Sequence, residues 1–202
     1  MDEKLDLQID QVKSVLLERP GRRMPAGEAD GLPEAAVCMV LRPDSQSHEL
    51  AALFIKRKER VGDPWAGHVA FPGGRFVKTD QHLLSTVIRE VLEETGIDLR
   101  TCAMLGTLDE LVPGNRAIKV TPFVALAPEQ VKVVPNEIEV SSHVWIPISF
   151  FMDRNNSLPY TIDGPGVGER RLVISFPFLG KYVVWGMTLR VMEDFLTKLY
   201  NH

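Results

Sequence analysis

Residues 71–99, FPGGRFVKTDQHLLSTVIREVLEETGIDL, place a double glycine ahead of three glutamates crowded near the end of a predicted helix. Hydrophobic residues recur at the spacing i, i+3, i+4 through residues 81–95, which predicts an amphipathic helix. Asp80 stands where a helix cap is expected, and Gly96 stands where a left-handed turn would end the helix. The buried stripe is expected to contain Leu84, Val87, Ile88, Val91 and Leu92.

Glu90, Glu93 and Glu94 are expected on the opposite face of this helix, in an unfavourable arrangement. Glu90 and Glu94 form a like-charge pair one turn apart, near the end of the helix where the dipole disfavours negative charge. A solvated acidic face is one interpretation. A bound cation would remove the repulsion, and oxygen ligands suit Mg²⁺ or Mn²⁺. Gly73 and Gly74 would let the backbone approach a ligand closely.

The same stretch resembles the Nudix box, whose second half reads Arg-Glu, an aliphatic residue, any residue, Glu-Glu, any residue, Gly and an aliphatic residue. That half is complete from Arg89 to Ile97. In the first half Asp80 replaces a glutamate, and eight residues rather than seven separate it from Arg89. The resemblance implies an α/β protein with the Nudix fold, an α/β/α sandwich around a mixed β-sheet. It also implies hydrolysis of a nucleoside diphosphate linked to another moiety.

The resemblance further implies roles for individual residues. Metal would be held by Glu90, Glu93 and Glu94 with a carbonyl from Gly73 or Gly74. Arg89 would orient the glutamates by ion pairing, and Glu90 or Glu94 would take part in catalysis. Members of the family also recruit an acid from a later loop. The stretch VVPNEIEVSSHVWIP, residues 133–147, offers Glu137 and Glu139, of which Glu139 is the preferred catalytic candidate.

A second set of sequence matches narrows the range of expected substrates. LFIKRKERVGDPWAGHVAFPGG, residues 53–74, is similar to the upstream pattern of coenzyme A pyrophosphatases, although extra residues separate Arg60 from Gly67. VWGMT, residues 184–188, is similar to a pattern near their C-terminus. The resemblance implies that Arg57, Arg60, Gly73 and Gly74 bind coenzyme A or an acyl derivative, which would yield 3′,5′-ADP and phosphopantetheine. ADP-ribose or another nucleoside diphosphate derivative remains an alternative, as does a Nudix-like binding module without catalysis.

The rest of the chain predicts strands and helices around this motif. Helices are expected at 2–18 and 186–200, with a short one at 147–153. Strands are expected at 35–41, 50–56, 103–111, 120–127, 137–147, 170–178 and 181–185, and a strand that runs into a tight loop is expected at 68–74. With no repeat or long linker, we expect a single domain over 1–202, with the helix and loop of 1–33 packed on it.

Composition excludes some functions. The 23 basic and 27 acidic residues give a net charge of −4, which argues against a nucleic-acid partner. Cys38 and Cys102 have no metal-site spacing and are expected to be buried thiols. No secretion signal and no run of roughly 20 apolar residues is present, so we expect a cytoplasmic protein without membrane contact. Its partner would be a small-molecule nucleotide derivative, and a homodimer is left open.

Overall fold

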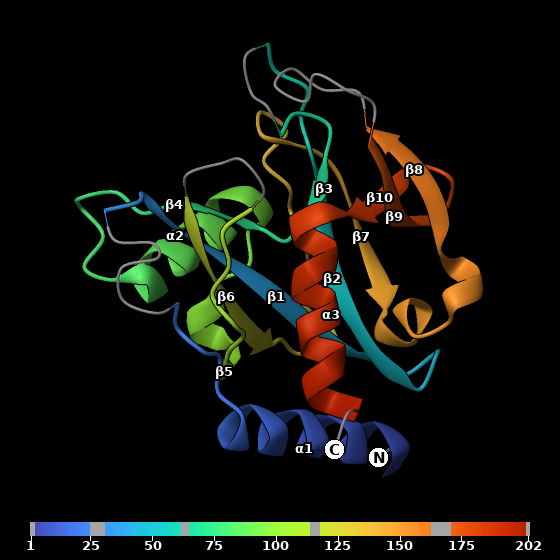
Figure 1. Cartoon of the computed structure of the whole chain (residues 1–202). Helices are drawn as coiled ribbons and strands as arrows, with labels where there is room; N and C mark the ends of the chain where they lie inside the picture. Colours follow the sequence, from blue (N-terminus) through green and yellow to red (C-terminus); the bar gives the residue numbers. More distant parts are fainter. Residues whose placement is uncertain (1–2, 25–30, 62–64, 114–117, 163–170, 201–202) are drawn as a thin grey trace.

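The computed structural model describes residues 3–24, 31–61, 65–113, 118–162 and 171–200, and shows a β-sheet with helices on both faces (Figure 1). The α-helices of these ranges are α1 (Glu3–Glu18), α2 (Leu83–Thr95) and α3 (Gly186–Tyr200). Short 3₁₀ helices are η1 (Leu99–Thr101), η2 (Ile148–Phe151) and η3 (Arg154–Asn156). Helix α2 covers one face of the sheet, and α1 and α3 cover the other. This is the predicted α/β/α sandwich.

The strands form two sheets. The larger sheet contains β1 (Glu34–Asp44), β2 (Glu49–Arg57), β3 (Val69–Ala70), β4 (Gly73–Arg75), β5 (Ala103–Thr107), β6 (Lys119–Leu126) and β7 (Val140–Pro147). Its order is β3-β2-β1-β6-β5, with β4 paired to β1 and β7 paired to β2. Because β1 and β6 run parallel and the other pairs are antiparallel, the sheet is mixed, as predicted. The smaller sheet contains β8 (Leu158–Ile162), β9 (Arg171–Phe178) and β10 (Tyr182–Trp185).

Strands β1 and β2 pair near their hairpin and then separate. Their described register runs from Asp44 opposite Glu49 to Leu41 opposite Ala52. Farther along, β3 pairs with β2 and β4 pairs with β1, so residues 69–75 cross from one strand to the other. The N–H of Cys38 donates to the carbonyl of Pro72 at 2.8 Å within this crossing. The double glycine therefore lies between the two separated strands.

Hydrophobic alternation along β1 builds two core layers. Ala36, Cys38 and Val40 face α2, where they pack in one cluster with Val87 and Val91. Alternate β1 residues belong to the cluster on the opposite face, with apolar residues of α1 and α3. This is the period-2 pattern expected of a strand buried on both sides.

Helix α2 differs from the prediction at its start and on its surface. It begins at Leu83, and its cap is His82, whose Nδ1 accepts from the N–H of Ser85 at 3.0 Å, so the predicted cap at Asp80 is wrong. Leu92, predicted to be buried, is 40% exposed. Gly96 ends the helix with φ 71°, as predicted.

The remaining elements mostly follow the prediction, including α1, α3 and both hairpins. Strand β8 was not predicted, and β7 begins later than expected because a turn precedes it. Cys38 is buried as predicted, whereas Cys102 is only partly buried. No helix within the described ranges has both the length and the apolarity to cross a membrane.

Candidate active site

Glu94, in the last turn of α2, is the buried centre of the candidate site. The residue is 1% exposed, and its Oε2 accepts a 2.8 Å hydrogen bond from the N–H of Gly73. Its Oε1 lies 3.5 Å from Nη1 of Arg57 at the end of β2. Burial raises the pKa of Glu94 to about 8, and the negative charges of Glu90 and Glu139 act in the same direction. The two neighbouring negative charges would stabilise a positive charge placed here.

Glu90 lies one turn earlier, directly against Gly74. A Cβ atom on Gly74 would stand 2.3 Å from Cδ of Glu90, so no side chain fits at this position while Glu90 keeps its place. Burial raises the pKa of Glu90, although Arg89 acts in the opposite direction. The double glycine thus brings the β4 backbone against two glutamates of α2, Glu90 and Glu94.

Arg89 contacts acids with all three guanidinium nitrogens. Nε and Nη2 donate to the two carboxylate oxygens of Asp80 at 3.0 and 2.9 Å. Nη1 donates to Glu90 at 2.8 Å and to Glu93 at 3.2 Å. The planar guanidinium therefore connects the loop before α2 to two of the three glutamates.

Asp80 anchors Arg89 instead of capping the helix. Its Oδ2 also accepts from the hydroxyl of buried Thr86 at 2.9 Å and from the N–H of Val77 at 3.2 Å. The hydrogen bonds from Arg89 hold the pKa of Asp80 well below its ordinary value. Sequence analysis missed this role, although an acid upstream of an arginine in the same motif was a usable signal for an ion pair.

Glu139 reaches the site from the turn that precedes β7. The N–H of Asn136, at the start of this turn, donates to the backbone carbonyl of Glu94 at 3.0 Å, and the N–H of Lys58 donates to the carbonyl of Glu139 at 2.7 Å. The charge of Glu139 contributes to the raised pKa of both Glu90 and Glu94. Its carboxylate therefore lies within electrostatic reach of both glutamates.

Arg60, which is expected to bind the substrate, and Lys58 both contact this turn. Nη2 of Arg60 donates to the carbonyl of Ile138 at 2.8 Å, and Nζ of Lys58 donates to that of Glu137 at 2.8 Å. The structure thus brings Arg57, Gly73, Gly74, Glu90, Glu94 and Glu139 to one place. Arg60 and Glu93 lie at its edge, with side chains 46% and 52% exposed.

The donor chemistry of the site fits a divalent cation. All candidate ligands are oxygens, and burial together with neighbouring negative charges, including that of Glu139, raises the pKa values of Glu90 and Glu94. Among the described residues, however, no three acidic, histidine or cysteine side chains already have the arrangement of a metal site. Arg89 engages Glu90 and Glu93, and Gly73 engages Glu94, so a cation would replace part of these contacts.

An aromatic group adjoins the site and was not connected to it by sequence analysis. The carbonyl of His68 accepts from the N–H of Arg57 at 2.9 Å, and the imidazole meets the ring of Trp185 edge-on, with centroids 5.0 Å apart. Trp185 also contacts Tyr160 of β8, at 6.1 Å between centroids. The hydroxyl of Thr188 donates to the carbonyl of Val69 at 3.1 Å, which fastens α3 to β3.

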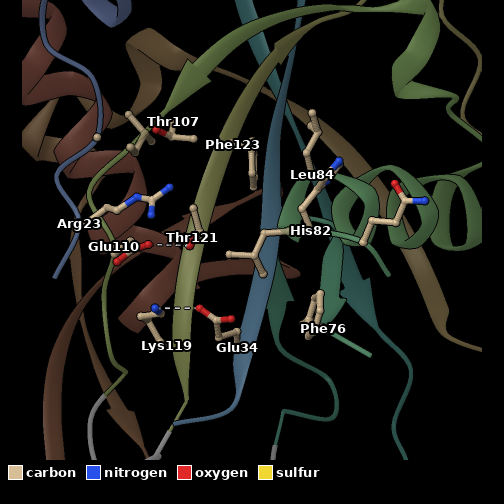
Figure 2. Close-up of a pocket in the computed structure, with 14 residues that line it drawn as sticks. Arg23, Glu34, Phe76, His82, Leu84, Thr107, Glu110, Lys119, Thr121 and Phe123 are labelled. Carbon is tan, nitrogen blue, oxygen red and sulfur yellow. Dashed lines mark hydrogen bonds and ion pairs between the residues drawn. The ribbon is translucent and has the colours of Figure 1, made fainter. Parts of the chain in front are cut away.

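A separate hollow of about 470 Å³ opens at the N-terminal end of α2 (Figure 2). Its lining includes His82, but none of the three glutamates. Lys119 pairs with Glu34 at 2.7 Å, and Glu110 accepts from the hydroxyl of Thr121 at 3.2 Å. Because these charges already have partners, the hollow lacks the concentrated like charge that marks the site around Glu94.

The chain is similar in sequence to known proteins of one family. The family model described as NUDIX domain matches residues 31–159. The uncharacterized Nudix hydrolase NudL of Pectobacterium atrosepticum is 29% identical over 147 residues, which cover 73% of this chain and 74% of that protein. The NudL protein of Yersinia pestis (strain Pestoides F) is 31% identical over 128 residues, which cover 63% of this chain and 62% of that protein.

The fold has a counterpart among solved structures. A MutT/nudix family protein from Enterococcus faecalis superposes with a TM-score of 0.54 at 16% identity, over 85% of this chain and 63% of that chain. At this identity the likeness concerns the fold alone.

Proposed function

The chain belongs to the Nudix family, and from this premise we propose that it hydrolyses the diphosphate linkage of coenzyme A or acyl-coenzyme A. The products would be 3′,5′-ADP and phosphopantetheine or its acyl derivative. The observation that carries the proposal is the position of Glu90 and Glu94 against Gly73 and Gly74, where β1 and β2 separate. A cation held at this place by the carboxylates and the backbone would attract an anionic diphosphate.

In this proposal, each residue of the site has a separate role. Mg²⁺ or Mn²⁺, when bound by Glu90, Glu93 and Glu94 beside the carbonyl of Gly73, supplies positive charge to the diphosphate and lowers the pKa of a bound water. Glu139 accepts the proton of the attacking water, because its charge acts on both Glu90 and Glu94 and its carboxylate lies 3.9 Å from the nearest nitrogen of Arg60. Arg89 keeps Glu90 and Glu93 in position through its anchor on Asp80.

Two features support coenzyme A as the substrate. The first is the resemblance of residues 53–74 and 184–188 to patterns of coenzyme A pyrophosphatases. The second is the surface formed by His68, Trp185 and Tyr160 beside Arg57, since a long uncharged arm needs an apolar surface next to the diphosphate site.

One observation favours ADP-ribose as a second candidate. Coenzyme A carries a 3′-phosphate, which calls for an additional cation. Lys58 and Arg60 both donate to backbone carbonyls of the turn before β7. A nucleoside diphosphate derivative without that phosphate would not require them.

A product assay tests both candidates. Purified protein is incubated with Mg²⁺ or Mn²⁺ and with coenzyme A, ADP-ribose, a dinucleoside polyphosphate or a nucleoside triphosphate, and the products are separated by chromatography. Release of 3′,5′-ADP from coenzyme A at the highest kcat/KM supports the proposal. Faster cleavage of ADP-ribose supports the second candidate, and binding without cleavage of any compound would indicate a non-catalytic module.

A further inference from the structure

We propose that Lys58 and Arg60 are positioning residues that hold the turn carrying Glu139 against the site, and do not bind the substrate directly. This inference rests on the proposed function for its catalytic consequence. The contacts themselves are independent of it. Both residues follow β2, whose last residue is Arg57, so they extend from the strand that delivers Arg57 to Glu94.

The hydrogen bonds within the turn before β7 are accepted by Asn136. The carbonyl of Asn136 accepts from the N–H groups of Glu139 and Val140, at 2.9 and 2.8 Å, and its side chain accepts from the N–H of Ile138 at 3.1 Å. These bonds close the turn on its inner side. They leave the carbonyls of residues 137–139 to be satisfied from elsewhere.

Lys58 and Arg60 supply donors to three consecutive carbonyls. Nζ of Lys58 donates to Glu137 at 2.8 Å, Nη2 of Arg60 donates to Ile138 at 2.8 Å, and the N–H of Lys58 donates to Glu139 at 2.7 Å. The two side chains thus reach adjacent carbonyls of the same turn. This pattern fixes the backbone of the turn at every residue that precedes β7.

The other end of the turn is fastened to α2. The N–H of Asn136 donates to the carbonyl of Glu94 at 3.0 Å, and the N–H of Val134 donates to that of Thr95 at 2.8 Å. These are carbonyls of the last helical turn, which have no partner within a helix. The turn therefore bridges the end of α2 and the end of β2, and Glu139 lies between them.

The carboxylate of Glu139 remains available within this arrangement. Nη2 of Arg60 stands 3.9 Å from Oε1 of Glu139, too far for a hydrogen bond, while it is 2.8 Å from the carbonyl of Ile138. The side chain of Glu139 is 40% exposed. Arg60 thus holds the backbone beneath Glu139 without sequestering its oxygens, which suits a group that must accept a proton.

The first test is hydrogen–deuterium exchange, which needs no substrate. In Arg60→Ala and Lys58→Ala proteins, we expect the amides of Glu139 and Val140 to exchange at least about tenfold faster, since local opening becomes less costly. Amides of β1 should keep their rates. Lys132→Ala is the matched control, because Lys132 is an exposed lysine a few residues before the turn. Unchanged exchange at 139 and 140 would overturn the positioning role.

The second test is a double-mutant cycle on the hydrolysis of coenzyme A or of the best alternative substrate. Arg60→Ala should lower kcat by about tenfold to a hundredfold with KM changed by less than about threefold, and Arg60→Lys should recover part of the loss. In a Glu139→Gln background, Arg60→Ala should cause little further loss, because its effect acts through Glu139. Additive losses, or a rise in KM as the main effect, would show that Arg60 binds the substrate. If the wild-type protein cleaves no diphosphate, the proposed function fails, while the exchange measurement still decides the positioning role.

Discussion

A hydrogen bond of 2.8 Å joins the backbone N–H of Gly73 to the carboxylate of Glu94, a residue that is 1% exposed. It connects the short strand β4 to the last turn of α2 at the point where β1 and β2 separate. The backbone at Gly73 has φ 147°, and a Cβ there would stand 2.3 Å from the carbonyl oxygen of Ala36. Glycine is therefore required both by conformation and by space.

Gly73→Ala should destabilise the fold. Because the obstructing atom belongs to the backbone of β1, the strand itself must move to admit a methyl group. We expect a loss of about 2–4 kcal/mol in the free energy of unfolding, measured by guanidinium denaturation. A loss below about 1 kcal/mol would contradict the close packing of β4 on β1.

Gly74→Ala provides the contrasting case. The obstructing atoms here form the carboxylate end of Glu90, a flexible side chain that can turn away. We expect a loss of less than about 1 kcal/mol in stability, but a fall in kcat of about a hundredfold as Glu90 is displaced. Comparison of the two alanine variants in the same denaturation and product assays separates the structural glycine from the one that gives Glu90 room.

Glu94→Gln should remove activity while keeping the fold. Glutamine retains an oxygen that can accept from the N–H of Gly73, but it loses the charge that a cation requires. We expect kcat to fall by at least about a hundredfold, with a circular dichroism spectrum like that of the wild type. Glu193→Gln is the control, since Glu193 is an exposed glutamate of α3 and has no role in the site. Unchanged hydrolysis by the Glu94 variant would refute the assignment of this carboxylate.

Some features of this site could be predicted from the sequence, and others could not. The helix and its end at Gly96 followed from local periodicity and from the demand of a left-handed turn, which depend on neighbours in the chain. The burial of Glu94 depends on β4 crossing from β2 to β1, which no local pattern encodes. The helix was therefore placed well, while the burial of Glu94 was not predicted.

Long-range partners account for the other differences. Asp80 was interpreted as a cap because it precedes the helix, but its partner Arg89 lies nine residues away across the loop. Arg60 is expected to bind the substrate from the resemblance to coenzyme A pyrophosphatases, and its contact with the turn before β7 is not apparent from the sequence. The turn at residues 136–139, whose carbonyl it contacts, is 78 residues distant in sequence. Such pairs become visible only when the strands are assembled.

The N-terminal segment should be held to the rest of the chain through Asp109. Its carboxylate accepts from the N–H of Arg22 at 2.9 Å and from Nζ of Lys198 in α3 at 2.7 Å. Asp109→Ala should therefore lower the free energy of unfolding by about 1–2 kcal/mol, because the N–H of Arg22 loses its acceptor and Nζ of Lys198, whose side chain is 11% exposed, is left with Asp194 at 3.6 Å. Arg22→Gln, at a side chain that is 84% exposed, should change it by less than about 1 kcal/mol. Equal effects would mean that Asp109 acts only as a surface ion pair.

The ion pair between Asp80 and Arg89 should make the free energy of unfolding depend on pH in acidic solution. The hydrogen bonds from Arg89 favour its ionised form in the folded protein, so its pKa lies well below the ordinary value of 3.8. The resulting stabilisation is fully present above the unfolded pKa and is lost as the pH falls below 3.8 toward the folded pKa. Asp80→Asn should lower the free energy of unfolding by about 2 kcal/mol at pH 7, since a charged hydrogen-bond partner is removed.

Urea denaturation of both proteins between pH 7 and about pH 3 measures this dependence. The difference between wild type and Asp80→Asn should stay constant down to about pH 5 and shrink below about pH 4, because the unfolded wild-type chain then takes up a proton at Asp80 that the folded protein does not. Asp10→Asn is the control, because Asp10 lies exposed on α1, where it pairs with Lys13 and does not contact Arg89. A difference that persists unchanged to pH 3 would mean that the Asp80 carboxylate is not the group that Arg89 stabilises.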